Sequence, residues 1–200
     1  MVSPRKKRKA RTRQEILDGA LALINEQGPD NFSLRALAKR VDYSPAGLYE
    51  YFENKDEIIA AVCAQSDQKL RRFLKQVPTD LPPTTYLVEL GKAYIQFALQ
   101  NEEQFMLMFS RVRESERIPY ELVSADETYR IVLNAVQSAI DSGYLYSRTD
   151  FGCDEIAYGL WALVHGMAVM QLTNLKYIDY DFERADRAVL EAFIAGLMHD

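Results

Sequence analysis

The chain has 200 residues, 48% of them hydrophobic, and a formal net charge of −5. This length and composition allow a substantial buried core, which excludes an intrinsically disordered protein and a small disulfide scaffold. Two cysteines, Cys63 and Cys153, lie far apart and fit no metal-site spacing, and the longest apolar run, residues 160–170, is too short for a membrane span. We therefore expect a protein of a reducing cytoplasm with no membrane partner.

The charge is divided unevenly along the chain. Residues 1–55 hold eleven Lys and Arg against seven acidic residues, a net charge of +4, so the remaining residues carry −9. Phosphate neutralisation by Lys and Arg supplies most non-specific affinity for DNA, whereas an acidic surface is repelled by the duplex. The division favours a DNA-binding amino-terminal part attached to an acidic body.

The first thirteen residues hold seven Lys and Arg and no acidic residue. They show no apolar periodicity, which predicts a disordered basic arm over residues 1–13, and no apolar stretch follows that would make them a secretory signal. Three functions are compatible with such an arm: contact along phosphates, entry into an adjacent minor groove, or simple solubilisation.

Three short helices are predicted next. An apolar stripe of helical period covers residues 12–27 and ends at Gly28-Pro29, and Ser33 caps a second helix. At Ser44-Pro45 an N-cap is followed by proline at the first helical position, which begins a third helix. Two short helices joined by a tight turn are typical of a helix-turn-helix, whose second helix enters the DNA major groove.

The run LRALAKRVDYSPAGLYEYFENKDEII, residues 34–59, resembles the helix-turn-helix and following helix of the TetR family of transcriptional repressors. The usual family pattern is I-A-x-x-x-G-V-S-x-G-T-L-Y-x-Y-F-x-x-K. The positions in register are Leu37-Ala38, Ser44, Leu48-Tyr49, Tyr51-Phe52 and Lys55.

The sequence departs from that pattern at three positions. Asp42 replaces the glycine of the turn, Tyr43 replaces a small apolar residue, and Gly47 stands where threonine or alanine is common. Aspartate tolerates a left-handed backbone better than most residues, so we expect the turn to persist. Gly47 lowers helix propensity but lets the backbone approach a phosphate.

The resemblance implies that the third helix is the recognition helix. We expect its early residues at base edges, and Tyr49, Tyr51 and Lys55 at phosphates, with Lys55 at a helix amino end. Leu37, Ala38 and Leu48 are expected in the core, and packing is the alternative for Tyr51. The predicted DNA-binding residues are Arg35, Ser44, Pro45, Ala46, Gly47, Tyr49, Tyr51 and Lys55.

The rest of the chain is also predicted to be helical. Asn54, with Glu57 three residues on, begins a fourth, connecting helix that ends before the prolines at 78, 82 and 83. Five further helices are predicted over residues 87–99, 102–113, 121–142, 151–174 and from 181 onward. The predicted fold is all-α with about nine helices, comprising a DNA-binding domain over 14–55 and a ligand-binding and dimerisation domain over 56–200.

The penultimate helix contains YGLWALVHGMAVMQL, residues 158–172, which is similar to the Trp-x-x-x-His-Gly signature of one subclass of TetR-family regulatory domains, often called WHG domains. Its Trp161 and His165 share one helix face. They are either ordinary core residues or part of an effector cavity with apolar walls and a few polar anchors. The candidate cavity residues are Tyr94, Phe105, Met108, Phe109, Tyr129, Trp161 and His165.

Small residues recur in the last two helices and allow helices to approach closely. This pattern suits a four-helix interface, so we expect a homodimer through the last two helices. A dimer also fits the expected function, because a single short recognition helix reads too few bases to be selective. The small residues are Gly159, Ala162, Gly166, Ala168, Ala185, Ala188, Ala192, Ala195 and Gly196.

No sequence feature indicates catalysis. The chain has no Glu-x-x-His pair, no Gly-rich phosphate loop and no nucleophile elbow, so we expect no enzyme activity, cofactor or metal. The predicted function is a homodimeric repressor that binds a partly palindromic operator and is released by a small-molecule effector. Two alternatives remain: an activator with the same head, and a helical small-molecule-binding bundle that does not bind DNA.

Overall fold

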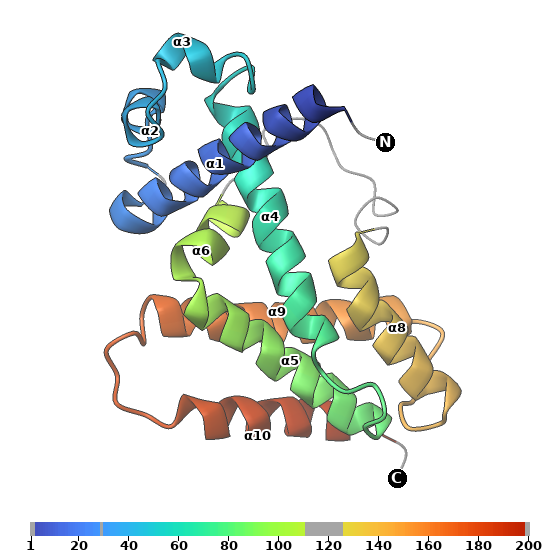
Figure 1. The fold of residues 1–200 in the computed structure, drawn as a ribbon. Coiled ribbons are helices and arrows are strands. Elements are labelled where there is room, and N and C mark those ends of the chain that lie inside the picture. Colours follow the sequence, from blue (N-terminus) through green and yellow to red (C-terminus); the bar gives the residue numbers. More distant parts are fainter. Residues whose placement is uncertain (1–2, 29, 111–125, 199–200) are drawn as a thin grey trace. The chain divides into compact units, whose positions relative to one another are not determined.

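A computed structural model describes residues 3–28, 30–110 and 126–198 of the chain. Over these residues it contains nine helices and no β-strand, with one isolated bridge between Arg148 and Phe151 (Figure 1). The predicted all-α class is confirmed. None of the helices in the described ranges is long and apolar enough to cross a membrane.

The chain divides into two compact units, which are described separately. The head unit comprises residues 1–67 and 103–112, and the body unit comprises residues 68–102 and 113–200. The division falls inside helix α4 (Lys55–Lys75), whereas the sequence predicts a domain boundary after Lys55. Because compact packing does not by itself define a domain, that boundary remains a prediction.

The head unit is built from α1 (Pro4–Gln27), α2 (Leu34–Arg40), α3 (Pro45–Leu48), the first part of α4, and α6 (Glu102–Ser110) from residue 103 onward. Each helix contributes apolar side chains to one core. The residues at most 1% exposed there include Ile16, Ile24, Leu37, Leu48, Ile58, Ile59 and Leu107. Leu107 places α6 with the head, although the sequence assigns residues 102–113 to the ligand-binding domain. An apolar stripe predicts that one face of a helix is buried, but it does not predict which of the two cores that face joins.

Helix α1 begins much earlier than expected. The Ser3 hydroxyl accepts a hydrogen bond from the Lys6 backbone N–H at 3.4 Å, and Pro4 follows at the first helical position. Lys, Arg and Ala are good helix formers, so residues 4–13 continue the same helix. The prediction of a disordered arm over residues 1–13 is therefore wrong for the part that the structure describes, which is a helical extension.

The turn between α2 and α3 has the left-handed backbone that the sequence predicts. Asp42 has φ 57°, and among the described residues it is the one non-glycine with a positive φ. The next residue, Tyr43, donates its backbone N–H to the Ala38 carbonyl at 2.9 Å. A glycine brings α1 against this end of α2, because a Cβ at Gly19 would lie 2.4 Å from Val41 Cγ1.

The body unit is organised around α5 (Pro83–Gln100), which packs against α8 (Glu127–Asp141), α9 (Cys153–Leu172) and α10 (Phe182–Ala195). Figure 1 shows α5 crossing α9 and α10. A Cβ at Gly91 would lie 2.9 Å from Leu190 and 3.1 Å from Val164, so three helices meet over this glycine. Residues 111–113 and 121–125, at the ends of two predicted helices, lie outside the described residues.

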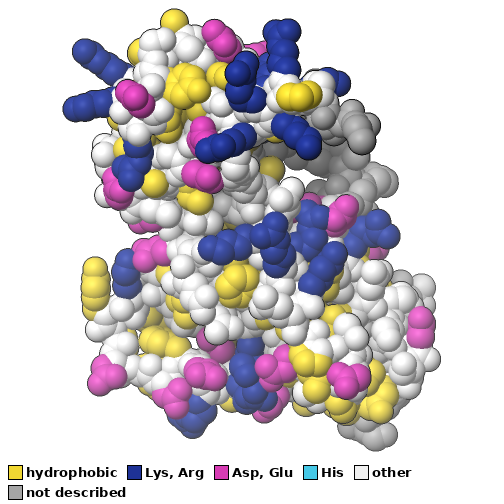
Figure 2. Space-filling view, in the orientation of Figure 1, with side chains coloured by type: hydrophobic (Ala, Val, Ile, Leu, Met, Phe, Trp, Pro, Cys, Tyr) yellow, Lys and Arg dark blue, Asp and Glu magenta, His cyan; other side chains and the backbone are white. Residues whose placement is uncertain are grey.

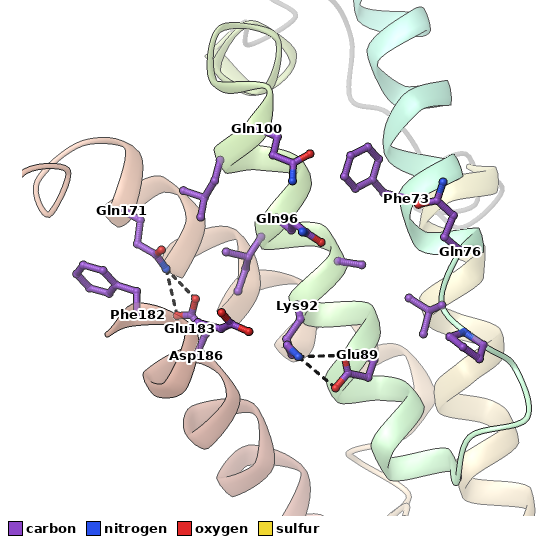
Figure 3. A pocket seen from close by; sticks show the side chains of 15 residues that line it. Phe73, Gln76, Glu89, Lys92, Gln96, Gln100, Gln171, Phe182, Glu183 and Asp186 are labelled. Carbon is purple, nitrogen blue, oxygen red and sulfur yellow. Dashed lines mark hydrogen bonds and ion pairs between the residues drawn. The ribbon is translucent and has the colours of Figure 1, made fainter. Parts of the chain in front are cut away.

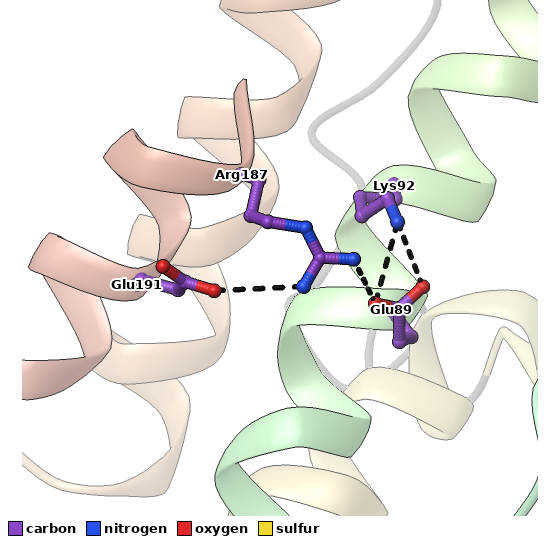
Figure 4. A network of polar contacts seen from close by, with 4 residues as sticks. All are labelled: Glu89, Lys92, Arg187 and Glu191. Atoms are coloured by element: carbon purple, nitrogen blue, oxygen red, sulfur yellow. Dashed lines mark hydrogen bonds and ion pairs between the residues drawn. The ribbon is translucent and has the colours of Figure 1, made fainter. Parts of the chain in front are cut away.

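A polar network at the surface joins α5 to α10 (Figure 4). Glu89 accepts hydrogen bonds from Lys92 at 3.1 Å and from Arg187 at 2.7 Å, and Arg187 also lies 3.5 Å from Glu191. Burial alone would raise the pKa of Glu89, but the hydrogen bonds from Lys92 and Arg187 outweigh it and the pKa is lowered. Exposed ion pairs add little stability, so the network orients α10 on α5 more than it stabilises the unit.

Candidate DNA-binding and effector sites

The recognition segment is short and is positioned by one buried leucine. The Ser44 hydroxyl accepts a hydrogen bond from the Gly47 N–H at 3.0 Å and caps α3, whose first residue is Pro45. Leu48 is 1% exposed and anchors the helix in the head core. Turns then continue to Phe52, with Tyr49 donating its N–H to the Ala46 carbonyl at 3.2 Å. This geometry leaves the Tyr49 side chain 57% exposed.

Most of the predicted DNA-binding residues are exposed on the head unit. Ser44, Pro45, Ala46 and Tyr49 are exposed, and Arg35 is exposed on α2. The other three predicted residues, Gly47, Tyr51 and Lys55, are half-buried. Contact of these residues with DNA remains a prediction.

Tyr43 before α3 and Gly47 within it, two of the departures from the family pattern, pack together. The rings of Tyr43 and Tyr51 meet edge to face with centroids 6.2 Å apart. A Cβ at Gly47 would lie 3.3 Å from both Tyr43 Cδ1 and the Ser44 hydroxyl oxygen, which is tighter than ordinary contact. Tyr43 and Gly47 therefore fit one another, because a larger residue at position 47 would press on the Tyr43 ring.

Lys55 is the first residue of α4, directly after the Asn54 side chain that caps the helix. Its ammonium nitrogen is 5.5 Å from the Phe32 ring centroid. Asn54 accepts a hydrogen bond from the Glu57 N–H at 2.8 Å, and the Glu57 carboxylate accepts one from the Glu53 N–H at 2.6 Å. Asn54 begins α4 as the sequence predicts, and its side chain satisfies one of the helix donors that would otherwise face an anion.

Two cations of the predicted basic arm also lie close to the recognition segment. Lys9 lies over the Tyr51 ring at 6.0 Å, and Arg13 lies over the Phe52 ring at 4.4 Å. Figure 2 shows several Lys and Arg side chains on this face of the head unit, and others on the body unit. The sequence signal was Ser3-Pro4, the same N-cap and proline pair that marks the start of α3.

Arg40, in contrast, is already paired. Its guanidinium donates to both carboxylate oxygens of Glu26 at 2.6 and 2.7 Å. The hydrogen bond from Arg40 is the main reason that the pKa of Glu26 is lowered. Arg40 is therefore less available to phosphates than Arg35 on the same helix.

The predicted effector residues fall in both units. Phe105, Met108 and Phe109 belong to α6 in the head unit, where the Phe105 and Phe109 rings lie 4.9 Å apart. The remaining four, Tyr94, Tyr129, Trp161 and His165, belong to the body unit. Effector contact by these seven residues remains a prediction.

The four body residues form one aromatic cluster. Trp161 packs edge to face on Tyr129 with centroids 5.7 Å apart, and Tyr94 Oη lies 3.0 Å from His165 Nδ1. Burial raises the pKa of Tyr94 well above its usual value, although a hydrogen bond with Trp161 lowers it in part, and burial lowers the pKa of His165. Burial therefore favours the neutral form of the imidazole, which shares a hydrogen bond with the Tyr94 hydroxyl.

A separate groove of about 880 Å³ lies along residues 89–100 of α5 (Figure 3). Helix α5 forms its floor, and the end of α4 and the start of α10 form its walls. Asp186, 7% exposed, lines the groove and accepts hydrogen bonds from Gln171 Nε2 at 2.9 and 3.1 Å. Burial raises the pKa of Asp186, partly offset by the Gln171 hydrogen bond. None of the seven predicted effector residues lines this groove.

Helices α9 and α10 expose apolar and small side chains at helical spacing. On α9, Tyr158, Ala162, Gly166 and Met170 follow one another at four-residue steps, and Tyr158 and Met170 are 63% and 50% exposed. On α10 the equivalent row is Ala185, Val189, Ala192 and Gly196. Two predicted interface residues face inward instead: Ala168 is fully buried, and a Cβ at Gly159 would lie 3.0 Å from the Phe193 ring.

Two family models match the chain. The model described as "Bacterial regulatory proteins, tetR family" matches residues 16–62, which include α2 and α3. The model described as "Tetracyclin repressor-like, C-terminal domain" matches residues 87–196, more than half of the chain.

Curated relatives and solved structures agree with these matches. The chain is 24% identical over 187 residues to the uncharacterised HTH-type transcriptional regulator YobS of Bacillus subtilis, covering 94% of this chain and 93% of YobS. It is 24% identical to the HTH-type transcriptional regulator BetI of Rhizobium meliloti, covering 91% and 87% of the two chains. Over a 65-residue segment, 32% of this chain and 34% of the relative, it is 35% identical to the nicotine-responsive repressor HdnoR of Paenarthrobacter nicotinovorans.

Among solved structures, a protein of unknown function from Rhodococcus sp. RHA1 superposes with a TM-score of 0.81 at 20% identity, covering 94% and 96% of the two chains. A TetR family transcription regulator from Marinobacter aquaeolei VT8 superposes with a TM-score of 0.70 at 16% identity, covering 98% and 100%. At these identities the likeness concerns the fold. Together with the two family models, it shows that the chain belongs to the TetR family of helix-turn-helix transcriptional regulators, which are DNA-binding proteins and not enzymes.

Proposed function

We propose that the protein is a homodimeric repressor that binds a partly palindromic operator and is released by a small-molecule effector. The observation that carries this proposal is the exposed row of Ser44, Pro45, Ala46 and Tyr49 on a unit whose first 55 residues carry +4. A helix displayed in this way, on a basic surface, is suited to the major groove. The operator would be met in the cytoplasm, where bacterial DNA lies.

The exposed rows of α9 and α10 support the dimer. Apolar and small side chains at three- and four-residue steps on α9 and α10 provide a surface that suits a two-fold interface. Small residues at Ala162 and Gly166 on α9 would let a partner helix approach closely, and a Cβ at Gly166 would meet no atom within 4 Å in the isolated chain. Two recognition helices about one turn of DNA apart would then read two half-sites.

The aromatic cluster of the body supports the effector part of the proposal. Tyr94, Tyr129, Trp161 and His165 combine apolar ring faces with a few polar groups, the usual character of a small-molecule site. HdnoR is a nicotine-responsive repressor. By analogy we propose that a small-molecule ligand releases this protein from its operator. An activator with the same head is the remaining alternative, and reporter-gene output with and without the protein distinguishes the two.

Replacing Tyr49 by Ala is expected to weaken operator binding about tenfold or more, because the ring is exposed and its loss removes only contacts with DNA. Thermal unfolding should change little, since exposed substitutions usually alter stability by no more than about 0.5 kcal/mol. Fluorescence anisotropy with labelled duplex measures the affinity. The matched control is Tyr144→Ala, which removes a 43% exposed tyrosine from the body unit. A large loss of stability in Tyr49→Ala would assign Tyr49 to the core and contradict the proposal.

Ligand binding at the aromatic cluster can be observed directly, because Trp161 is the single tryptophan of the chain. A compound that raises the melting temperature and dissociates operator DNA should also shift or quench tryptophan emission. The Trp161→Phe variant, which keeps an aromatic ring, provides the signal-free control. If a compound releases DNA while Trp161 emission stays unchanged, the effector binds elsewhere, and the groove lined by Asp186 becomes the next site to test.

A further inference from the structure

The first turns of α1 form a charged surface that recognition by α3 does not use. Residues 5–13 contain seven Lys and Arg, and the first acidic residue of the chain is Glu15. Arg11 lies 2.9 Å from Glu15, and Arg13 lies 3.6 Å from Glu57. Within the described ranges, no ion pair joins residues 5–9 to an acidic side chain. A strong concentration of uncompensated positive charge on one element calls for a polyanion.

The cations occupy two faces of α1 that can be told apart by helical spacing. Seven residues make about two turns, so each cation shares a face with the residue seven positions on. For Arg5 and Lys9 these residues are Thr12 and Ile16, which are buried, and for Lys6 it is Arg13, which is half-buried over the Phe52 ring. For Lys7, Arg8 and Arg11 they are Gln14, Glu15 and Asp18, which are exposed. We name the first three cations the inner row and the second three the outer row.

The inner row lies beside the recognition segment. Lys9 is 6.0 Å from the centroid of the Tyr51 ring, and Arg13, one turn further, is 4.4 Å from the Phe52 ring. Tyr51 and Phe52 lie three and four residues after the end of α3, so these contacts place α1 close to the recognition segment. The inner row is therefore on the side of the head that would meet DNA, and the outer row is turned away from it.

We infer that the inner row, Arg5, Lys6 and Lys9, is a helical phosphate clamp that binds the DNA backbone beside the segment read by α3. This inference rests on the proposed DNA-binding function. Direct insertion into the minor groove is disfavoured, because an α-helix with side chains is about 10–12 Å wide and the groove is about 6 Å wide. The ten residues from Pro4 to Arg13 span roughly 15 Å, equal to about four base pairs.

Matched triple variants test the clamp. Replacing Arg5, Lys6 and Lys9 by Gln removes three charges from the inner row, and replacing Lys7, Arg8 and Arg11 by Gln removes three from the outer row. The inner-row variant should lose about tenfold or more in affinity for operator and for random duplex alike, and its slope of log affinity against log salt should fall by about two to three. The outer-row variant should keep nearly wild-type values.

A third variant separates the helical clamp from an extended arm. Ala10→Pro changes no charge, but proline removes a helical hydrogen bond and clashes with the preceding turn, so residues before it leave the helix. Ala10 is exposed, and α1 can restart at the proline, so the rest of the head should fold normally. A clamp predicts a loss similar to that of the inner-row variant, together with loss of hydroxyl-radical protection over about four base pairs beside the α3 site. An extended arm in the minor groove predicts that Ala10→Pro binds like the wild type.

The outcomes are distinguishable from failure of the proposed function. Wild-type binding to a specific duplex, with equal affinities and salt slopes for the inner-row and outer-row variants, would overturn the clamp and leave the repressor proposal intact. The same conclusion would follow from wild-type footprints in the Ala10→Pro variant. If the wild-type protein shows no preference for any duplex, the proposed function itself fails, whichever row binds phosphate.

Discussion

Replacing Ala46 by Asp should reduce operator affinity at least about a hundredfold, equivalent to roughly 2.8 kcal/mol. Ala46 is exposed on α3 and supports no core contact. A carboxylate at this position would face phosphates and the acceptor groups of the major groove, and it would be repelled by both. Folding should not suffer, because a negative charge in the first turn of a helix is favourable. Binding and stability are thus expected to change in opposite directions.

Anisotropy titrations and thermal unfolding measure the two effects of this substitution. The control is Ala60→Asp, which makes the same change at an exposed alanine of α4 in the same unit. Both substitutions change the net charge by the same amount. Any difference in operator affinity between the two variants therefore arises from where the carboxylate lies. Equal affinities for Ala46→Asp and Ala60→Asp would show that α3 does not enter the groove.

Replacing Ala162 by Arg should convert the dimer into a monomer. Ala162 is exposed on α9 in the row that contains Tyr158 and Gly166. A guanidinium placed in an apolar interface without a partner would lose its hydration, at a cost of several kcal/mol. Because the DNA-binding head of a monomer reads only one half-site, loss of the dimer should lower operator affinity about a hundredfold or more.

Sedimentation velocity at micromolar concentration reports the oligomeric state of this variant. Gln96→Arg, an equally exposed position on α5 outside the α9 and α10 rows, serves as the control and should remain dimeric. A dimeric Ala162→Arg protein with wild-type affinity would place the interface on another surface. Retained secondary structure, measured by circular dichroism, would show that the loss of the dimer is not a loss of the fold.

The helix-turn-helix could be predicted from the sequence because it is local. Its determinants, Ser33, Asp42 and the Ser44-Pro45 pair, act over one or two turns through caps and backbone preference. The left-handed backbone of Asp42 follows from such chemistry alone. Ser3-Pro4 has the same form as Ser44-Pro45, but the polar run behind it lacks an apolar stripe. Periodicity therefore does not predict a helix over residues 4–11, although the cap does.

The helices of the body could be predicted from the sequence, but the contacts that bring its polar and aromatic side chains together could not. The apolar residues of α6 indicate burial, yet only the structure shows that Leu107 joins the head core. The Tyr94 and His165 contact joins residues 71 positions apart, and the Gln171 and Asp186 pair is formed by single polar residues on two largely apolar faces. The sequence separation of neither pair matches a pattern that would predict the contact from a single sequence. The Trp-x-x-x-His-Gly signature indicates two members of the aromatic cluster, Trp161 and His165, but not their contacts with Tyr129 and Tyr94.

Selection of duplexes from a random pool, followed by competition titration, tests the central proposal most directly. The wild-type protein should enrich an inverted repeat with half-sites about one helical turn apart. At physiological salt it should bind that duplex at least about a thousandfold more tightly than a scrambled duplex of the same length. Enrichment of no common sequence, with equal affinity for the selected and scrambled duplexes, would contradict the proposal that this protein is an operator-specific repressor.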